Sequence, residues 1–100
     1  MHAQVIAGGT TPDLRSKMDQ IVTDEMIPAL RAEAGFAGAL NFVNRDNGQA
    51  MMIVLWDTEA QAHRELSQYG DAFLRALANV AAITTGNRQP IAVWEVNARV

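Results

Sequence analysis

Apolar and polar residues alternate along some stretches of the chain and recur at helical spacing along others. Residues 2–7 alternate and include β-branched side chains, which predicts a strand. Residues 8–12 are expected to end this strand. Within them Thr11 is a suitable N-cap, with Pro12 at the first helical position, where the missing N–H of proline does no harm.

The next segment has the apolar spacing of a helix. Its apolar side chains are Leu14, Met18, Ile21, Val22, Met26 and Leu30. Pro28 lies inside this pattern and cannot donate a backbone hydrogen bond, so the helix is expected to kink or restart near residues 26–27. Gly35 is the expected stop, because glycine readily adopts the left-handed conformation that ends many helices.

Two further strands and a hairpin are predicted in the middle of the chain. Residues 37–45 and 49–56 read as strands, separated by Asp46, Asn47 and Gly48. The Asn-Gly pair predicts a type I′ turn, in which both central residues have positive φ.

The last part of the chain predicts a second helix and a fourth strand. Asp57 or Thr58 caps the helix, and Thr58 with Gln61 fits a capping box. Gly70 is expected to break the helix in two. Its apolar stripe consists of Leu66, Tyr69, Phe73, Leu77 and Val80. Residues 84–90 are expected to form a loop, and residues 91–96 the last strand.

The order strand, helix, strand, strand, helix, strand defines the expected fold. It predicts an α+β class, with a ferredoxin-like βαββαβ arrangement of a four-stranded antiparallel sheet and two helices on one face. Residues 1–100 are enough for one domain with one core.

The third strand also predicts the assembly. Met51, Ile53 and Leu55 would lie on one face, whereas Met52, Val54 and Trp56 would lie on the other, so both faces are apolar. Two helices can cover only one face. A homodimer through the uncovered face is therefore expected, with a monomer as the alternative if this strand is central and apolar on both sides only near its ends.

Charge, cysteine content and the length of apolar runs limit the classes of partner that the chain can bind. Net charge is −3, and the eight Lys and Arg residues are scattered, which argues against nucleic acid. The absence of cysteine excludes disulfides and thiolate metal sites. No apolar run approaches the ~20 residues of a membrane span, and no signal peptide is visible. We therefore expect a cytoplasmic protein that does not bind membranes.

Three stretches in the middle of the chain resemble the antibiotic biosynthesis monooxygenase-like superfamily. They are residues 35–40 (GFAGAL), 44–48 (NRDNG) and 53–60 (IVLWDTEA). The resemblance implies a dimeric α+β barrel. It leaves the activity open, because the superfamily includes cofactor-free quinone-forming monooxygenases, haem-degrading enzymes and proteins of unknown role.

The resemblance also suggests which residues to compare. Trp56 matches the strand-end tryptophan of the cofactor-free enzymes, in which an asparagine four residues earlier and a tyrosine in the next helix orient the substrate. Met52 and Ala62 occupy those two positions here. The haem-degrading branch uses a histidine of the second helix, and residues 75–77 offer none. Trp56 is therefore either part of a site or simply packed beneath the second helix.

Other candidate residues come from the chain itself. His63 could act as a base, because imidazole titrates near neutral pH, or could be a solvated helix residue. Asn41 could bind a ligand if it faces the helices, or be an edge-strand polar residue if it faces outward. Tyr69 is expected in the core, with its hydroxyl hydrogen-bonded or at a pocket edge. Any ligand is expected between the sheet and the helices, near Trp56.

Two functions remain open at this point. The first is a cofactor-independent monooxygenase acting on a small aromatic or polyketide-like substrate, with Trp56 and His63 as the catalytic candidates. The second is a non-catalytic dimeric module that binds a small apolar ligand or has a structural role. No cofactor is expected, and no spacing of histidines and carboxylates predicts a metal site.

Overall fold

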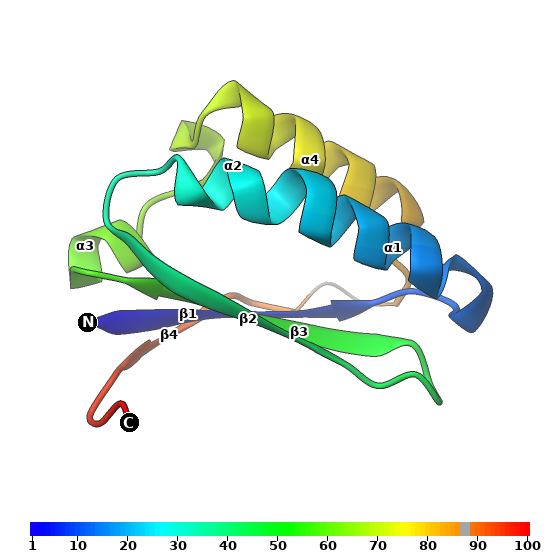
Figure 1. Ribbon diagram of the computed structural model, residues 1–100, viewed down its shortest axis with the longest axis horizontal. Coiled ribbons are helices and arrows are strands. Elements are labelled where there is room, and N and C mark those ends of the chain that lie inside the picture. The colour runs from blue at the N-terminus through cyan, green and yellow to red at the C-terminus, as the bar shows by residue number, and fades with distance from the viewer. Residues whose placement is uncertain (87–88) are drawn as a thin grey trace.

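The computed structural model describes residues 1–86 and 89–100 and has four antiparallel strands in one sheet (Figure 1). The strands are β1 (His2–Gly9), β2 (Phe36–Val43), β3 (Gln49–Trp56) and β4 (Ala92–Glu95). Their order in the sheet is β2-β3-β1-β4, which is the ferredoxin-like order. The predicted fold class is therefore confirmed. The predicted third strand has the observed bounds. The first predicted strand starts at the observed residue and ends two residues early, and the second and fourth differ by one or two residues at each end.

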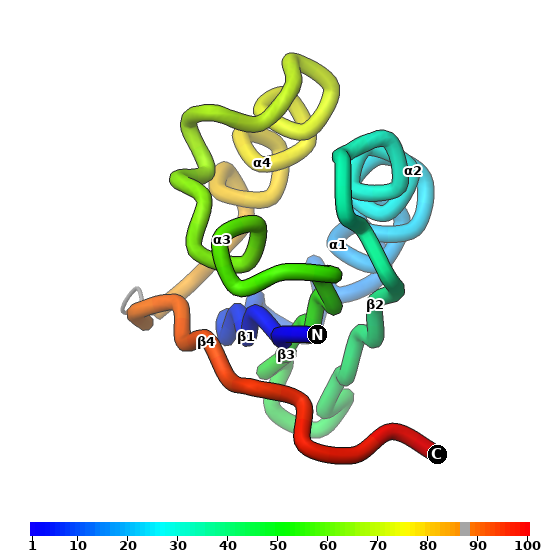
Figure 2. Tube along the Cα trace, turned by 90° about the vertical axis from the view of Figure 1, so that its left-hand side faces the viewer, coloured from blue at the N-terminus to red at the C-terminus, as the bar shows by residue number. Residues whose placement is uncertain are grey.

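The helices cover one face of the sheet and lie side by side above it (Figure 2). The first helical arm contains η1 (Pro12–Leu14), α1 (Arg15–Ile21), η2 (Val22–Met26) and α2 (Ile27–Arg31). The second contains α3 (Glu59–Ala62), η3 (Leu66–Gln68) and α4 (Asp71–Ile83). Within the described residues, no helix is long and apolar enough to cross a membrane.

Pro28 changes the first helical arm where the sequence predicts. A π-helical turn, η2, ends at Met26 and α2 begins at Ile27, because Pro28 has no N–H to donate to the preceding turn. The predicted stop at Gly35 is wrong, since α2 ends at Arg31. The amide of Ala32 closes this last turn on Ala29 and Leu30, and Gly35, with a φ of 84°, belongs to the turn that leads into β2.

The β2–β3 hairpin has a different turn from the predicted one. Asn44 and Gln49 are joined by a 2.8 Å backbone hydrogen bond, so four residues form the connection instead of two. Gly48 alone has a positive φ, of 75°, and Asn47 does not. The type I′ prediction is therefore wrong. The reason is the register of the strands, in which Val43 pairs with Ala50 and leaves a longer loop.

The helix-start predictions are confirmed in part. Thr58 and Gln61 form the predicted capping box, with reciprocal hydrogen bonds of 3.2 and 3.1 Å. Gly70 breaks the second arm as predicted and lies at the N-cap of α4. Thr11 is the residue before η1, but its side chain makes no capping hydrogen bond. Part of the predicted loop, residues 87–88, lies outside the described residues.

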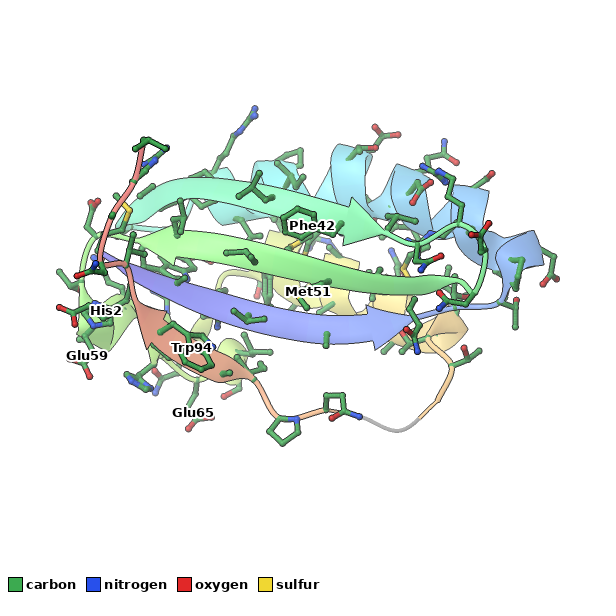
Figure 3. All side chains as sticks on the ribbon, turned by 90° about the horizontal axis from the view of Figure 1, so that it is seen from below. His2, Phe42, Met51, Glu59, Glu65 and Trp94 are labelled. Carbon is green, nitrogen blue, oxygen red and sulfur yellow. The ribbon has the colours of Figure 1, made fainter. Side chains whose placement is uncertain are left out.

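Both faces of the sheet are apolar, as the third strand predicts, but only one of them is covered by the helices. Met52, Val54 and Trp56 are buried against the helices, where they join the single core. The opposite face is open, and Phe42, Met51 and Trp94 stand on it in Figure 3. The open-face side chains of all four strands are mostly apolar. The C-terminal tail crosses one end of this face, where Arg99 lies close to Gly38 (Figure 2), and the rest is covered by no other part of the described chain.

Candidate functional site

A cavity of about 510 Å³ lies between the sheet and the two helical arms. Its volume is within the roughly 300–1,000 Å³ typical of small-molecule sites. Most of its walls are apolar side chains from both layers, including Ile6, Met18, Val22, Leu30, Met52 and Phe73. The residues at the end of β1, Gly8 and Gly9, and the end of α4 also border it. The fold thus places an apolar cavity inside its helix-covered layer.

Asn41 is one of the few polar residues that line this cavity. It pairs with Met52 across the β2–β3 ladder, so its side chain lies on the helix-covered face of the sheet. Its Nδ2 donates a 3.3 Å hydrogen bond to the carbonyl oxygen of Met51. The other face, which the sequence left as an alternative for Asn41, is occupied by Leu40 and Phe42.

Arg15 is the cavity-lining residue that the sequence reasoning missed. It is only 4% exposed, and its Nη1 donates to the carbonyl oxygen of Gly48 over 3.3 Å. Its Nε donates to Oδ1 of Asp19 over 3.0 Å. A signal was present, because Arg15, Met18 and Val22 follow the i, i+3, i+7 spacing of a buried helix face.

Asp19 is shared between two arginines. Its Oδ2 accepts a 2.9 Å hydrogen bond from Arg45, while its Oδ1 accepts from Arg15. Burial alone would raise the pKa of the Asp19 carboxyl, but hydrogen bonds and charge attraction from Arg45 and Arg15 outweigh it and lower that pKa. Asp19 is therefore the carboxylate that holds both guanidinium groups.

Trp56 lies in an aromatic cluster away from the cavity lining. It is 1% exposed, and its indole N–H donates to Oε1 of the buried Gln4 over 3.2 Å. Its ring meets Phe36 and Tyr69 edge-on, at centroid distances of 6.3 and 5.8 Å. The ring of Tyr69 packs in turn against that of Phe73, with 4.5 Å between the ring centroids, and Phe73 lines the cavity. The cluster therefore stands behind one wall of the cavity.

Tyr69 is held by charged neighbours as well as by packing. The guanidinium of Arg64 lies 4.2 Å from the centre of its ring, and Arg64 pairs with Glu33 at 2.8 Å. Burial raises the pKa of the Tyr69 hydroxyl. Glu33 also accepts a 2.7 Å hydrogen bond from the backbone N–H of Gly70. This hydrogen bond and, after it, the pairing with Arg64 lower the pKa of the Glu33 carboxyl.

His63 is separate from the cavity. Its side chain is 59% exposed, and it does not appear among the described residues that line the cavity. Its Nε2 lies 3.7 Å from Glu59, and His2 lies at the same distance from the other oxygen of Glu59. Among the described residues, no group of three or more His, Asp or Glu side chains is arranged to hold a metal ion.

A second hollow, of about 650 Å³, lies at the hairpin end of the sheet. It is more open to solvent, and many of its lining residues are glycines and polar loop residues, such as Gly48 and Thr85. Phe42 and Met51 connect it to the open apolar face. We take the cavity between the layers as the candidate site, because its apolar walls come from two layers and surround a few polar groups.

Solved structures with the same architecture were found across the whole chain. SnoaB from Streptomyces nogalater, a cofactor-independent oxygenase, is 14% identical, with a TM-score of 0.72 over 99% of this chain and 96% of that one. A Nitrosomonas europaea protein, provisionally named an antibiotic biosynthesis monooxygenase, is 15% identical, with a TM-score of 0.75 over 98% and 100%. A third protein, named an antibiotic biosynthesis monooxygenase, is 17% identical, with a TM-score of 0.69 over both whole chains.

Sequence comparisons add nothing to these structural matches, since no family model and no curated protein matches the chain. Identities of 14–17% are informative about the fold and silent about the activity. The resemblance drawn from residues 35–60 and the structural matches agree on the same family of folds. The chain has the fold of the antibiotic biosynthesis monooxygenase-like superfamily.

Proposed function

We propose that the chain is a cofactor-independent monooxygenase that acts on a small aromatic or polyketide-like substrate in the cavity between sheet and helices. The observation that carries the proposal is the apolar cavity of about 510 Å³, with Asn41 among its few polar lining groups. Apolar walls suit a planar aromatic body, and a few polar groups suffice to orient it. The shared fold with SnoaB supports the reaction class.

The chemistry requires that the substrate itself reduces oxygen. An activated aromatic methylene group loses a proton and passes electrons to O₂, and a carbon–oxygen bond forms to give a hydroperoxide. Loss of water from the hydroperoxide leaves a carbonyl, so one CH₂ group and one O₂ become one C=O group and one H₂O. The protein contributes by holding the ionised substrate in a dry, oriented position.

The residues have different parts in this proposal. Asn41 orients the substrate by hydrogen bonding from the cavity wall. Trp56 and Tyr69 support the Phe73 wall from behind, so they shape the cavity without lining it. His63, the candidate base suggested by the sequence, is exposed and lies outside the cavity lining, so we assign it no part in turnover. We therefore expect His63→Ala to leave turnover within about a factor of two.

We further propose that two copies pair through the open face of the sheet. Trp94 is 64% exposed and Phe42 49%, and the neighbouring open-face residues on β1 and β3 are apolar as well. An apolar face of this extent suits a two-fold pairing in which each copy presents the same surface. The pairing would also cover the hollow beside Phe42 and Met51.

A non-catalytic ligand-binding module is the second candidate function. It is favoured by the position of Trp56, which lies in the core cluster with its indole N–H already bound to Gln4. A tryptophan in that position stabilises the fold and is not available to a ligand. Binding without turnover would support this second function.

Oxygen uptake by the purified protein tests the proposal. Dithranol, a dihydroxyanthrone with an activated methylene group, is a suitable probe, and heat-denatured protein corrects for its spontaneous oxidation. We expect one O₂ consumed per quinone formed, at the same rate before and after treatment with a chelator. A rate equal to the corrected background, with dithranol still bound, would reject the monooxygenase and leave the binding module.

A further inference from the structure

Arg15 is a buried cation whose hydrogen-bonding capacity is only partly used. Nε is bound to Asp19 and Nη1 to the carbonyl of Gly48, whereas Nη2 has no partner among the described residues. A buried guanidinium N–H without an acceptor is unfavourable, because it has given up its hydrogen bonds to water. The position of Arg15 on the cavity wall means that a ligand can supply the missing acceptor.

The charges around Arg15 do not cancel. Asp19 accepts hydrogen bonds from both Arg15 and Arg45, so one carboxylate faces two guanidinium groups and one positive charge remains. Arg45 is exposed and is screened by water, whereas Arg15 is buried. Among the described residues that line the cavity, Arg15 alone is charged. The cavity therefore has one cationic end and otherwise apolar walls.

The cationic end has a defined place in the fold. Arg15 begins α1 beside Gly48, so it lies at the hairpin end of the cavity. Leu30, Leu66 and Phe73 line the apolar interior. A ligand with an anion at one end and an aromatic body at the other matches this arrangement.

We propose that the cavity binds an aromatic carboxylic acid, with its carboxylate on Arg15 and its ring system among the apolar side chains. The planar guanidinium matches a carboxylate in shape and charge, and Nη2 provides unused donors for it. The proposal rests on the proposed function only in that both use the same cavity. It adds the substrate class, which is a carboxylated aromatic compound, and it applies equally to binding without turnover.

Calorimetric titration with 2-naphthoate and its neutral amide tests this proposal, because the two probes differ in charge and hardly in shape. Wild-type protein is expected to bind 2-naphthoate about ten to a hundred times more tightly than 2-naphthamide. Arg15→Met should abolish the difference. Arg45→Met is the matched control, since Arg45 bonds the same Asp19 but lies outside the cavity lining, and it should retain the preference.

The outcomes separate this proposal from the proposed function. Equal affinity of the wild-type protein for the two probes would overturn the carboxylate site while leaving cavity binding intact, and this comparison needs no variant that has to fold. A preference that survives in Arg15→Met would also overturn it. Failure of both probes to bind would reject both the carboxylate site and the cavity as a ligand site.

Discussion

The indole N–H of Trp56 donates a 3.2 Å hydrogen bond to Oε1 of Gln4, and both side chains are buried. Trp56→Phe leaves the Gln4 amide without its partner, and Gln4→Leu leaves the indole N–H without an acceptor. Each variant should lose about 1–3 kcal/mol in free energy of unfolding, beyond any loss of packing. In urea titrations the double variant should lose less than the sum by about 1 kcal/mol, whereas strict additivity would show that the bond contributes nothing.

Gly48 and Gly86 both have positive φ, of 75° and 86°, but only Gly48 is closely surrounded. A Cβ on Gly48 would overlap the carbonyl oxygen of Thr10, while a Cβ on Gly86 would meet nothing among the described residues. Gly86→Ala should cost about 1 kcal/mol from backbone strain alone. Gly48→Ala should shift the urea midpoint considerably further, and equal shifts would contradict the close approach of the hairpin to Thr10.

Glu33 joins the two helical arms, and its contribution to stability should depend on pH. Its pKa is lowered in the folded state, first by the Gly70 amide and then by Arg64. The stabilisation is therefore complete above the ordinary pKa of 4.5 and is lost as the pH falls through the lowered value. Glu33→Gln should be less stable than wild type by about 1 kcal/mol at neutral pH and by little near pH 2.

The control for that prediction is Glu65→Gln, which changes an exposed glutamate in the same region. Its unfolding free energy should follow that of wild type across the pH range. If Glu33→Gln and Glu65→Gln had the same pH profile, the Gly70 and Arg64 contacts would not stabilise the fold.

The open face can be tested by placing a charge on it. Trp94→Lys puts a cation on the edge-strand part of the proposed dimer contact, and an unpaired charge there is costly to bury. Light scattering should give twice the 10.9 kDa chain mass for wild type and a single chain mass for Trp94→Lys. Glu95→Lys is the matched control on the neighbouring, helix-side position of β4 and should remain a dimer. A wild-type monomer would reject the pairing.

The strands could be predicted from the sequence, because side chains along a strand point alternately to its two faces and their polarity indicates which face is buried. Met51 and Met52 read as opposite faces, and the structure places one outside and one in the core. The hairpin turn could not be predicted from Asn47 and Gly48, since the same dipeptide fits several loop lengths and the strand register decides among them. The predicted helix stop at Gly35 was wrong for a similar reason. A glycine indicates a turn, but it does not distinguish the end of a helix from the turn that follows it.

The candidate site was harder to predict than the fold. Arg15 was overlooked because a charged residue is ordinarily read as exposed, although its spacing with Met18 and Val22 fits the buried face. The meeting of His2 with Glu59 depends on how β1 and α3 pack, which no local pattern contains. Asn41 was correctly recognised as a polar break in a strand, but only the register places it on the cavity side.

The most direct test of the proposed function is whether filling the cavity stops turnover. Ala81 borders the cavity from α4, and Ala82 is the next residue on the same helix and lies outside the lining. We expect Ala81→Trp to slow quinone formation from dithranol by about tenfold or more, because the indole takes up space in the cavity, and Ala82→Trp to match wild type. Equal rates for Ala81→Trp and Ala82→Trp would contradict the assignment of the cavity as the site of reaction.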